Sequence, residues 1–460
     1  MKKVSALLLA ILLCLVLPVT AFAFSGGDGS PGNPFIITTA AELDAVRNHL
    51  DAHFRLGNDI DLTDYLAPGG DGYAKWGRRG WEPIGGRLRA PRWEPNQPEF
   101  SGSFDGNGHV IRNLRIFRED SEGVGLFGRS SGEIRNLGVE IASGIVVGRS
   151  DVGGLVGRQQ GGSIINSYAT GNVSGVGSDV GGLVGWLQGG SIENSYATGN
   201  VRGAGIASGY VGGLVGWLQD GSITNSHATG DVSGSSDEIG GLVGRQQYGT
   251  ITNSYATGNV GGYRTVGGLV GWQLRGTITN SYATGDVIGG IGVGGLVGSQ
   301  TGGTITNSYA TGRVIGIHNV GGLAGGIHGS TITNSYAMGN VNCIDIVELM
   351  GNIGVSEWWM EGGPTGVGGL IGNWADSTIT NSFRYQNATI SGEVNLADEP
   401  DRRHGGIMTA DQLMSQATYE NNGWQFTPSA WHWDSRGFPK LNIGTEDWPF
   451  PFPYNAEPTS

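Results

Sequence analysis

The strongest constraint on the fold of this chain is a short phrase that it repeats. TITNSYATGDV, at residues 277–287, returns with small changes along most of the sequence. It alternates with a second phrase, [VI]-G-G-L-[VAI]-G, which starts at residues 152, 180, 211, 239, 266, 293, 320 and 367. Most of these starts lie close to 27 residues apart, and the last step is 47 residues. A regular period of this length is typical of chains that fold as stacked repeats.

The residues inside the repeat indicate what kind of stack it forms. They are rich in β-branched side chains and contain no helical pattern, and glycine supplies 87 of the 460 residues. Each repeat is then one coil of a β-solenoid, and coils bury their apolar side chains by stacking on one another. We predict an all-β fold, a right-handed parallel β-helix of ~27-residue coils with a short helical cap at each end. Nine coils spaced ~4.8 Å apart would make a rod roughly 40 Å long.

Alternation along the strands predicts which columns of side chains face the core. Ile251, Ile278, Ile305 and Ile332 each have threonine on both sides, so isoleucine points inward and the hydroxyl groups outward. A column of asparagines recurs at Asn166, Asn194, Asn225, Asn253, Asn280, Asn307, Asn334 and Asn381. It predicts an internal ladder of amide hydrogen bonds at a bend, with a row of surface asparagines as the alternative. The tyrosine column that follows could face either way, because a bend changes the alternation after it.

The first residues read as a secretory signal. A basic start, the apolar run SALLLAILLCLVLPVTAFA and an A-x-A site at 21–23 predict cleavage after residue 23, so we expect no membrane span afterwards. Cleavage removes two lysines and no acid, which changes the net charge from −13 to −15 and argues against nucleic acid as a partner. Only Cys343 survives, so no internal disulfide is expected.

We divide the chain into six segments. They are the signal peptide at 1–23, an N-terminal cap and first coils at 24–122, the repeat β-helix at 123–342, a loop insertion at 343–366, the last coils at 367–398, and a C-terminal cap and tail at 399–460.

The two alternating phrases resemble the GLUG motif of secreted and surface bacterial β-helix proteins. The stretches FRLGNDIDL (54–62), WEPIG (81–85) and FSGSFDGNGHVIRNL (100–114) match that family as well, so the resemblance covers most of residues 34–445. It implies a parallel β-helix at the cell exterior, often in adhesion-like proteins, and says little about the ligand. Some relatives carry a metallopeptidase domain related to IgA-cleaving enzymes, and no such domain is recognisable in this sequence.

Two capping boxes mark the expected lids of the solenoid, whose end coils must be covered. Thr39 to Glu42 opens the amphipathic stretch AAELDAVRNHLDAHF, and Thr409 to Gln412 opens TADQLMSQATYE. The aromatic tail that follows is expected to wrap the last coil. No sorting signal is recognisable in the tail, which favours release or non-covalent retention at the surface.

Two groups of aromatic residues are candidates for binding a ligand. Trp358 and Trp359 lie in the loop insertion, where they could stack on sugar rings or pack back onto the rod. The second group follows the G-G-L-V-G phrase as Arg158, Trp186, Trp217, Arg245 and Trp272, and then Ser299. If this column faces outward, cation–π contacts follow, and it is either a glycan-binding ladder or a plain surface stack. Nearby hydrogen-bond groups would come from Gln159, Gln188, Gln219, Gln246 and Gln273.

A third pattern is the pair of threonines in T-x-T. It occurs at 250/252, 277/279, 304/306, 331/333 and 378/380, after Ser222 and Thr224. A flat threonine array of this kind is used by ice-binding solenoids, although threonine also suits any solvated strand.

Metal and catalytic signals are weak. His49 and His53 share a predicted helix face but lack the H-E-x-x-H pattern, and the acids of NDIDLTD (58–64) divide between two strand faces. We expect no metal and no cofactor. The acids of residues 152–342 appear scattered, with no recurring column, at Asp179, Glu193, Asp220, Asp231, Asp237, Glu238 and Asp286. We therefore assign no catalytic residue.

These observations predict a monomeric, secreted or cell-surface protein that binds without catalysis. The expected partner is an extracellular polysaccharide or the surface of a host or neighbouring cell. The first alternative is a lyase or hydrolase acting on carbohydrate, which would require carboxylates and a basic residue in a groove along the rod. The second is an ice-binding protein, which would require the T-x-T columns to form one flat, uncharged face.

Overall fold

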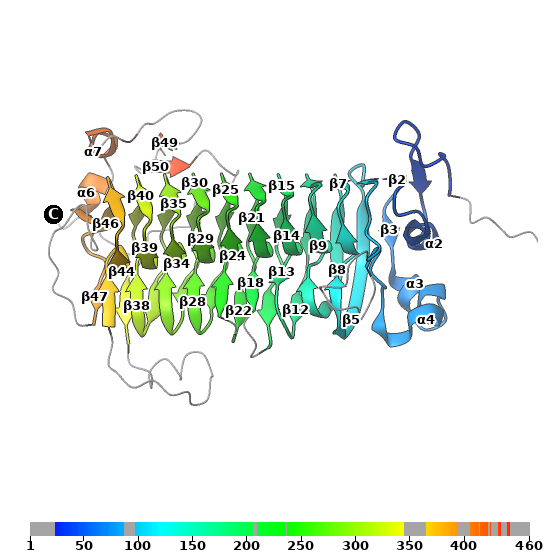
Figure 1. The fold of residues 1–460 in the computed structure, drawn as a ribbon, viewed down its shortest axis with the longest axis horizontal. Helices are drawn as coiled ribbons and strands as arrows, with labels where there is room; N and C mark the ends of the chain where they lie inside the picture. Colours follow the sequence, from blue (N-terminus) through cyan, green and yellow to red (C-terminus); the bar gives the residue numbers. More distant parts are fainter. Residues whose placement is uncertain are drawn as a thin grey trace, which may run out of the picture.

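The computed structural model describes residues 24–86, 97–205, 209–235, 237–344, 365–392, 405–413, 415–421, 424, 431–433 and 439–441. The described chain winds into a rod of stacked coils with short helices at both ends (Figure 1). Strands of successive coils pair in parallel and in register. The predicted parallel β-helix is therefore confirmed, while its right-handed sense stays a prediction. The proposed signal peptide at 1–23 lies outside the described residues.

One face of the rod is a 12-stranded sheet, here called the threonine sheet. Its strands are β1 (Phe35–Ile37), β2 (His53–Leu56), β4 (Ser103–Asp105), β7 (Glu133–Arg135), β10 (Ser163–Ile165), β15 (Ser191–Glu193), β20 (Ser222–Thr224), β25 (Thr250–Thr252), β30 (Thr277–Thr279), β35 (Thr304–Thr306), β40 (Thr331–Thr333) and β45 (Thr378–Thr380). Ile251, Ile278 and Ile305 are fully buried at the centres of their strands. The predicted inward column of isoleucines is confirmed.

A second face is a nine-stranded sheet, here called the tryptophan sheet. Its strands are β6 (Phe127–Ser130), β9 (Val156–Gln160), β14 (Val184–Gln188), β19 (Val215–Gln219), β24 (Val243–Gln247), β29 (Val270–Leu274), β34 (Val297–Thr301), β39 (Ala324–His328) and β44 (Ile371–Ala375). The valine that opens most of these strands is buried in the core, as are the leucines just before it.

The remaining strands belong to a third sheet that contributes three short strands per coil. It begins with β3 (Ile60–Asp61), β5 (Val110–Val124) and β8 (Gly138–Val152). The tyrosine strands are β11 (Tyr168–Thr170), β16 (Tyr196–Ala197), β21 (His227–Ala228), β26 (Tyr255–Ala256), β31 (Tyr282–Ala283), β36 (Tyr309–Ala310), β41 (Tyr336–Ala337), β46 (Phe383–Tyr385) and β48 (Gly406–Met408). The valine strands are β12 (Val173–Gly175), β17 (Val201–Gly203), β22 (Val232–Gly234), β27 (Val260–Gly261), β32 (Val287–Ile288), β37 (Val314–Gly316), β42 (Val341–Cys343) and β47 (Ile390–Ser391). The strands that precede the tryptophan sheet are β13 (Val180–Gly181), β18 (Tyr210–Gly212), β23 (Glu238–Gly240), β28 (Arg264–Gly267), β33 (Ile291–Gly294), β38 (His318–Gly321) and β43 (Thr365–Gly368).

The tyrosines stack on one another along the rod, outside the main core. The ring planes of Tyr255, Tyr282 and Tyr309 differ by only 1° and 0°, with centroids 4.8 and 4.9 Å apart. Neighbouring coils are therefore related almost by pure translation. The column's later members form a separate hydrophobic cluster with C-terminal residues that include Tyr419 and Trp424. The tyrosines thus face away from the coil interior and are covered in the C-terminal half.

The asparagine column forms the predicted ladder at a bend, but the ladder lies at the surface. Asn280 donates its side-chain amide to Asn253 at 3.1 Å and accepts from Asn307 at 3.1 Å. All eight asparagines have positive φ, 49° at Asn280, a left-handed conformation that asparagine tolerates better than most residues. The inner side of the corner is occupied instead by buried serines, such as Ser281, whose backbone N–H donates to the hydroxyl of Ser308 at 3.3 Å. The expectation of an internal ladder was wrong because the left-handed residue turns its side chain outward.

The N-terminal cap contains less helix than predicted. The capping box at Thr39 and Glu42 is present, but α2 (Ala40–Ala45) is followed by the 3-10 turn η1 (Val46–Asn48), and the chain re-enters the threonine sheet at β2. Further short helices are α3 (Thr63–Leu66), α4 (Asp71–Trp76) and the 3-10 turn η2 (Gly77–Arg79). Pairing with the first coil, through Phe54, outweighs the helical pattern of residues 49–54.

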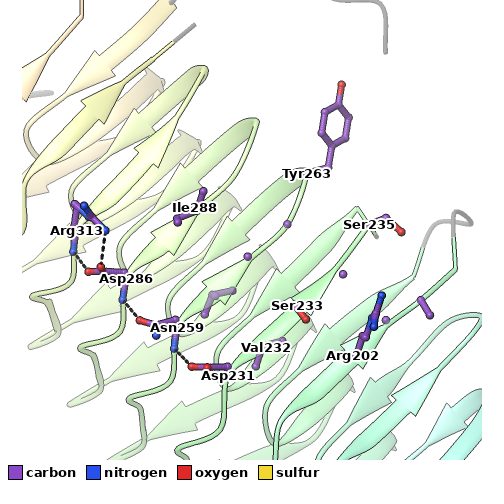
Figure 2. Close-up of a pocket in the computed structure, with 16 residues that line it drawn as sticks. Arg202, Asp231, Val232, Ser233, Ser235, Asn259, Tyr263, Asp286, Ile288 and Arg313 are labelled. Atoms are coloured by element: carbon purple, nitrogen blue, oxygen red, sulfur yellow. Dashed lines mark hydrogen bonds and ion pairs between the residues drawn. The ribbon is translucent and has the colours of Figure 1, made fainter. Parts of the chain in front are cut away.

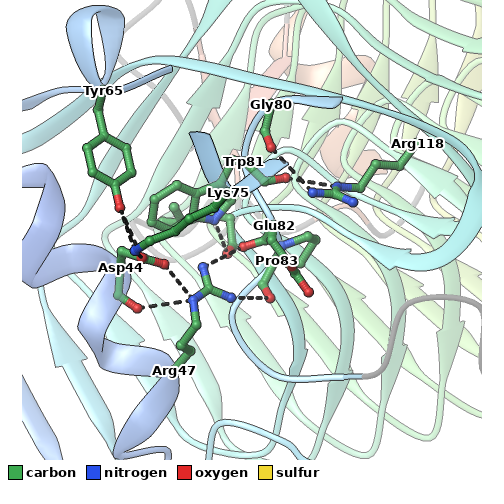
Figure 3. A network of polar contacts seen from close by, with 10 residues as sticks. Asp44, Arg47, Tyr65, Lys75, Gly80, Trp81, Glu82, Pro83 and Arg118 are labelled. Atoms are coloured by element: carbon green, nitrogen blue, oxygen red, sulfur yellow. Dashed lines mark hydrogen bonds and ion pairs between the residues drawn. The ribbon is translucent and has the colours of Figure 1, made fainter. Parts of the chain in front are cut away.

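A polar network fastens this cap to the first coils (Figure 3). Asp44 contacts Lys75, accepts from Tyr65 at 2.9 Å and pairs with Arg47 at 2.6 Å. The Arg47 guanidinium also lies 5.2 Å from the ring centroid of Trp76 and 5.3 Å from that of Trp81. Cation–π contacts and an ion pair therefore hold the lid over the end coil.

The C-terminal cap is confirmed as a short helical lid. Thr409 and Gln412 form the predicted capping box, with side-chain to backbone distances of 2.8 and 3.1 Å. The helical stretch divides into α6 (Ala410–Leu413) and α7 (Gln416–Asn421), and β49 (Trp431–Trp433) pairs with β50 (Pro439–Leu441) in an antiparallel hairpin.

The stack continues in register on either side of the insertion. Pairing resumes between His318 and Thr365 and between Val320 and Val367, so the coils before and after it stack directly. Residues 345–364, including Trp358 and Trp359, lie outside the described residues. Cys343 is a buried free thiol, and burial raises its pKa to about 11. Among the described residues, no helix is long and apolar enough to cross a membrane.

Candidate functional site

The column of tryptophans and arginines forms a continuous ladder on the tryptophan sheet. Arg158 pairs in register with Trp186, Trp186 with Trp217, Trp217 with Arg245, and Arg245 with Trp272. The sequence therefore placed these five residues in one line correctly.

Most of the aromatic ring faces in the ladder are covered by other members of the ladder. The guanidinium of Arg158 lies 3.7 Å from the ring centroid of Trp186, and Trp186 stacks on Trp217 at 4.4 Å and 11°. Arg245 lies 4.2 Å from the ring centroid of Trp272. Arg158 and Trp186 are buried, and the other three members are partly buried. The predicted cation–π contacts are confirmed, but Trp186 and Trp217 have no free face to offer a sugar.

A partly buried contact between an arginine and a glutamate supports the middle of the ladder. Arg245 donates to the Tyr210 hydroxyl at 2.5 Å and lies 3.6 Å from the Glu238 carboxylate. Burial raises the pKa of Glu238 to about 8, although the Arg245 charge opposes this shift. The contacts hold Arg245 flat against Trp272.

The glutamines beside the ladder divide between two faces of the sheet. The sequence had predicted that all of them offer hydrogen-bond groups at the surface. Gln159, Gln246 and Gln273 point inward and are fully buried, where Gln246 bonds the carbonyl of Gly249 at 2.8 Å. Gln188 and Gln219 are partly exposed, because they lie one residue further along the strand.

The acids are not as scattered as the sequence indicated. Asp151 and Asp179 each precede the valine of the G-G-L-V-G phrase, and Glu238 holds the equivalent position in a later coil. Asp231 and Asp286 belong to a second column, described below. The prediction that the acids form no recurring column was wrong. The columns become visible only when the position of each acid is numbered within its own repeat.

An open groove of about 700 Å³ lies over the valine strands of the third sheet (Figure 2). It crosses residues 202–204, 231–235, 259–263, 286, 288 and 313, which come from five successive coils. The groove therefore runs along the rod rather than across one coil. Sequence reasoning missed it, because no motif marks it.

One wall of the groove is a ladder of carboxylate and amide groups. Asp231 accepts the backbone N–H of Asn259 at 2.8 Å, and Asn259 accepts that of Asp286 at 3.0 Å. Asp286 accepts both the backbone N–H of Arg313 at 2.8 Å and its guanidinium at 3.1 Å (Figure 2). Each side chain uses one oxygen for the ladder, which fixes the wall in place.

The floor of the groove is formed by side chains of different sizes, and the smallest lie at Ser233 and Gly261. Arg202, Ser233 and Gly261 occupy equivalent positions on β17, β22 and β27. A Cβ built on Gly261 would meet nothing within 4 Å, so open space lies directly above it. Tyr263 stands away from the floor on the opposite side from the acidic wall (Figure 2). The groove thus combines one aromatic ring with charged and neutral hydrogen-bond groups.

The T-x-T columns also line up as expected. Thr250, Thr277 and Thr304 pair in register, as do the second threonines of the same strands. From β20 to β45 the outward positions of the threonine sheet carry only serine and threonine. Acids and arginines on this sheet are confined to earlier strands, such as Glu193 on β15.

The candidate metal residues serve other purposes. His49 lies among Phe24 and Phe35, while His53 contacts the Ser103 hydroxyl at 2.8 Å. The carboxylate of Asp59 accepts from Arg112 at 2.7 Å.

A second acid of that stretch also has a partner within the protein. Asp61 accepts from Thr63 at 2.6 Å. Among the described residues, no group of three or more acids, histidines or cysteines could hold a metal ion.

Together, the fold and its ladders define a β-solenoid repeat protein. The GLUG motif matches six segments, residues 148–174, 176–202, 207–233, 236–261, 262–288 and 289–315. The chain therefore carries six GLUG-motif repeats between residues 148 and 315.

Two relatives share part of this sequence. A stretch of 118 residues is 45% identical to a protein of Evansella cellulosilytica that is provisionally named a Gly-rich membrane protein, and covers 25% of this chain. A stretch of 155 residues is 35% identical to halomucin of Haloquadratum walsbyi, and covers 32% of this chain. The matched stretches span only 12% and 2% of those relatives.

Two solved structures align over 91% of the chain with little similarity. One is a Bacteroides ovatus protein provisionally described as an immunoglobulin A1 protease, at 20% identity, a TM-score of 0.36 and 95% coverage of that chain. The other is named IgA1 protease, at 15% identity, a TM-score of 0.37 and 25% coverage of that chain. These TM-scores are too low to support any inference.

Proposed function

We propose that this protein is a secreted or cell-surface binding protein that holds an extracellular polysaccharide along the groove of the third sheet, without catalysis. The observation that carries this proposal is the direction of the groove. A site that continues over five coils suits an extended chain, whereas a compact ligand would use a single deep pocket.

The chemistry of the groove also suits a polysaccharide. Sugars present hydroxyl groups and an apolar ring face, and the groove offers Asp231, Asn259 and Ser233 for the former and the ring of Tyr263 for the latter. Arg202 adds a cation for a carboxylate or sulfate on an acidic sugar. The Arg313 cation is already paired with Asp286.

Export and surface location rest on the expected signal peptide and on the names of the two relatives, a membrane protein and halomucin. We propose that the rod acts as a monomer, which light scattering of the purified chain would check.

The test is retention of residues 24–460 on a panel of insoluble polysaccharides, with soluble sugar assayed in the same tubes. Tyr263→Ala and Arg202→Ala should lower retention. Tyr248→Ala and Arg264→Ala are matched controls, because both residues are exposed and neither lines the groove. Equal retention of all four variants, or no retention of the parent on any polysaccharide, would refute the assignment.

Catalysis on the same groove is the second candidate. Asp231 and Asp286 lie two coils apart, roughly 9.6 Å from the strand spacing, near the range of inverting glycosidases. Both carboxylates, however, are solvent-accessible and accept backbone N–H groups, and neither has the apolar surroundings that a general acid needs. Release of soluble sugar that stops in Asp231→Asn or Asp286→Asn would favour the enzyme.

Ice binding is the third candidate. It is favoured by the uncharged outward side chains of the threonine sheet. Coils related by translation keep that sheet flat, as the tyrosine stack shows. Thermal hysteresis that is abolished by Thr279→Lys would support it, and its absence in the parent protein would exclude it.

A further inference from the structure

The ladder on the tryptophan sheet stops abruptly after Trp272. The next three positions in register are Ser299, Gly326 and Asn373. The large flat side chains that run from Arg158 to Trp272 are thus followed by two coils with almost no side chain in the column. A stack that ends in this way leaves its last ring with one face uncovered.

Trp272 differs from the other two ladder tryptophans in how many of its ring faces are covered. Trp186 is covered by Arg158 and by Trp217, and Trp217 is covered by Trp186 and approached by Arg245 and the edge of Tyr210. Arg245 covers only one face of Trp272. Among the described residues no aromatic or cationic group covers the other face, which points toward Ser299. A serine side chain is too small to cover an indole.

The space beside this face is long enough for a sugar ring. Three coil steps separate Trp272 from Asn373, which amounts to roughly 14 Å at the usual strand spacing. A Cβ built on Gly326 would have Ser299 Oγ at 3.9 Å and Asn373 Cβ at 4.0 Å as its nearest neighbours, so the floor is low but closed. We call this space, between Trp272 and Asn373, the ladder gap.

Polar groups border the ladder gap. Thr301 and His328 occupy the outward column two residues further along the same strands, next to Ser299 and Gly326, and both are at least partly exposed. None of these described side chains is an acid. A guanidinium or ammonium group stacked on Trp272 would therefore lack a carboxylate partner, whereas the hydroxyl groups of a neutral ring would find donors and acceptors.

We propose that the ladder gap is a second carbohydrate site, in which one sugar ring lies with its apolar face against Trp272 and its hydroxyl groups near Ser299, Thr301 and Asn373. The inference takes its ligand class from the proposed function but uses a different sheet. A ring stacked on Trp272 lies across the rod axis, so this site holds a chain end or a branch rather than the chain that follows the groove. It follows that Trp272 is the ladder tryptophan that contacts the sugar, whereas Trp186 and Trp217 do not.

The test titrates residues 24–460 with soluble gluco-, xylo-, galacto- and chito-oligosaccharides, up to roughly 10 mM, while tryptophan fluorescence is recorded. Trp272→Ala should weaken binding at least tenfold. Ser299→Arg provides the second variant, since it should place a guanidinium on the open face as Arg245 does on the opposite one. This variant fills the gap while every tryptophan remains. Ser222→Arg, on the threonine sheet, is the control for added charge.

The outcomes separate this site from the groove. Loss of the titration in Trp272→Ala and Ser299→Arg, with Ser222→Arg and Tyr248→Ala unchanged, supports the ladder gap. Binding to Ser299→Arg as tight as to the parent protein, or no response from any oligosaccharide, overturns it. N-acetylarginine amide is titrated in parallel, and a response to this probe alone would make the occupant a cation and the sugar assignment wrong. Retention on insoluble polysaccharide that depends on Tyr263 would then still stand.

Discussion

The surface asparagine ladder allows the contribution of a left-handed backbone to be measured separately from that of its hydrogen bonds. Asn280 makes two ladder bonds, each at 3.1 Å, and has a φ of 49°. Loss of both bonds costs about 1–3 kcal/mol. An alanine in the left-handed region costs about 1–2 kcal/mol more. Glycine avoids this penalty, and loses only about 0.5–1 kcal/mol through the flexibility of the unfolded chain.

We therefore expect Asn280→Ala to lower the free energy of unfolding by about 2–5 kcal/mol, and Asn280→Gly to lower it by less. Asn259 is the matched control. It also belongs to a side-chain ladder along the rod, but its φ is not positive. At that position the order should reverse, with glycine less stable than alanine by about 0.5–1 kcal/mol.

The assay is equilibrium unfolding in urea, followed by tryptophan fluorescence. Midpoints are compared across the four variants because repeat arrays can depart from two-state behaviour. The reasoning fails if alanine is as stable as glycine at position 280, or if both positions rank the two residues in the same order.

Three further predictions concern single residues. Burial lowers the pKa of His227 to about 4, against 6.5 in the unfolded chain, so the stability present above pH 6.5 should fall as the pH drops toward 4. His227 stacks on Tyr196 and Tyr255, and His227→Tyr keeps a ring in the stack without the imidazole, so this part of the acid sensitivity should disappear from denaturation curves. The Cys343 thiol is buried, with its pKa raised to about 11, so a thiol-specific reagent should label it only after unfolding, and rapid labelling of the native protein would contradict its burial. Arg47→Ala removes the cation between two tryptophans and the partner of Asp44, so we expect the N-terminal lid to loosen and the rods to associate end to end, as seen by size-exclusion chromatography with light scattering; an unchanged monomer would show that the lid does not need this contact.

Much of the fold could be predicted because the repeat enforces it at every coil. A column such as Ile278 can be assigned inward from its two threonine neighbours alone, and a capping box such as that at Thr39 depends only on residues three apart. The helical pattern of residues 49–54 failed for the opposite reason. Its strand at His53 forms through pairing with distant coils, which local propensity does not report.

The candidate sites were less accessible to sequence reasoning. The tryptophan and arginine column was found because its members follow a recognisable phrase. The groove depends on Ser233 and Gly261, whose small size is informative only when the neighbouring coils are aligned. The same alignment, counted from the G-G-L-V-G phrase, would have grouped Asp231 with Asp286.

The sequence by itself determined that this chain stacks in coils, since repeats with a period near 27 residues bury their apolar side chains by stacking on their neighbours. It also determined which side chains lie in line, because translation from coil to coil brings equivalent positions together. Only the tertiary structure decided which surfaces are available. The left-handed backbone at the corners turned the asparagine side chains outward. Stacking covered the ring faces of Trp186 and Trp217, and the end of the ladder left one face of Trp272 uncovered. Exposure depends on what the neighbouring coil places against a side chain, and that neighbour lies a full repeat away in the chain.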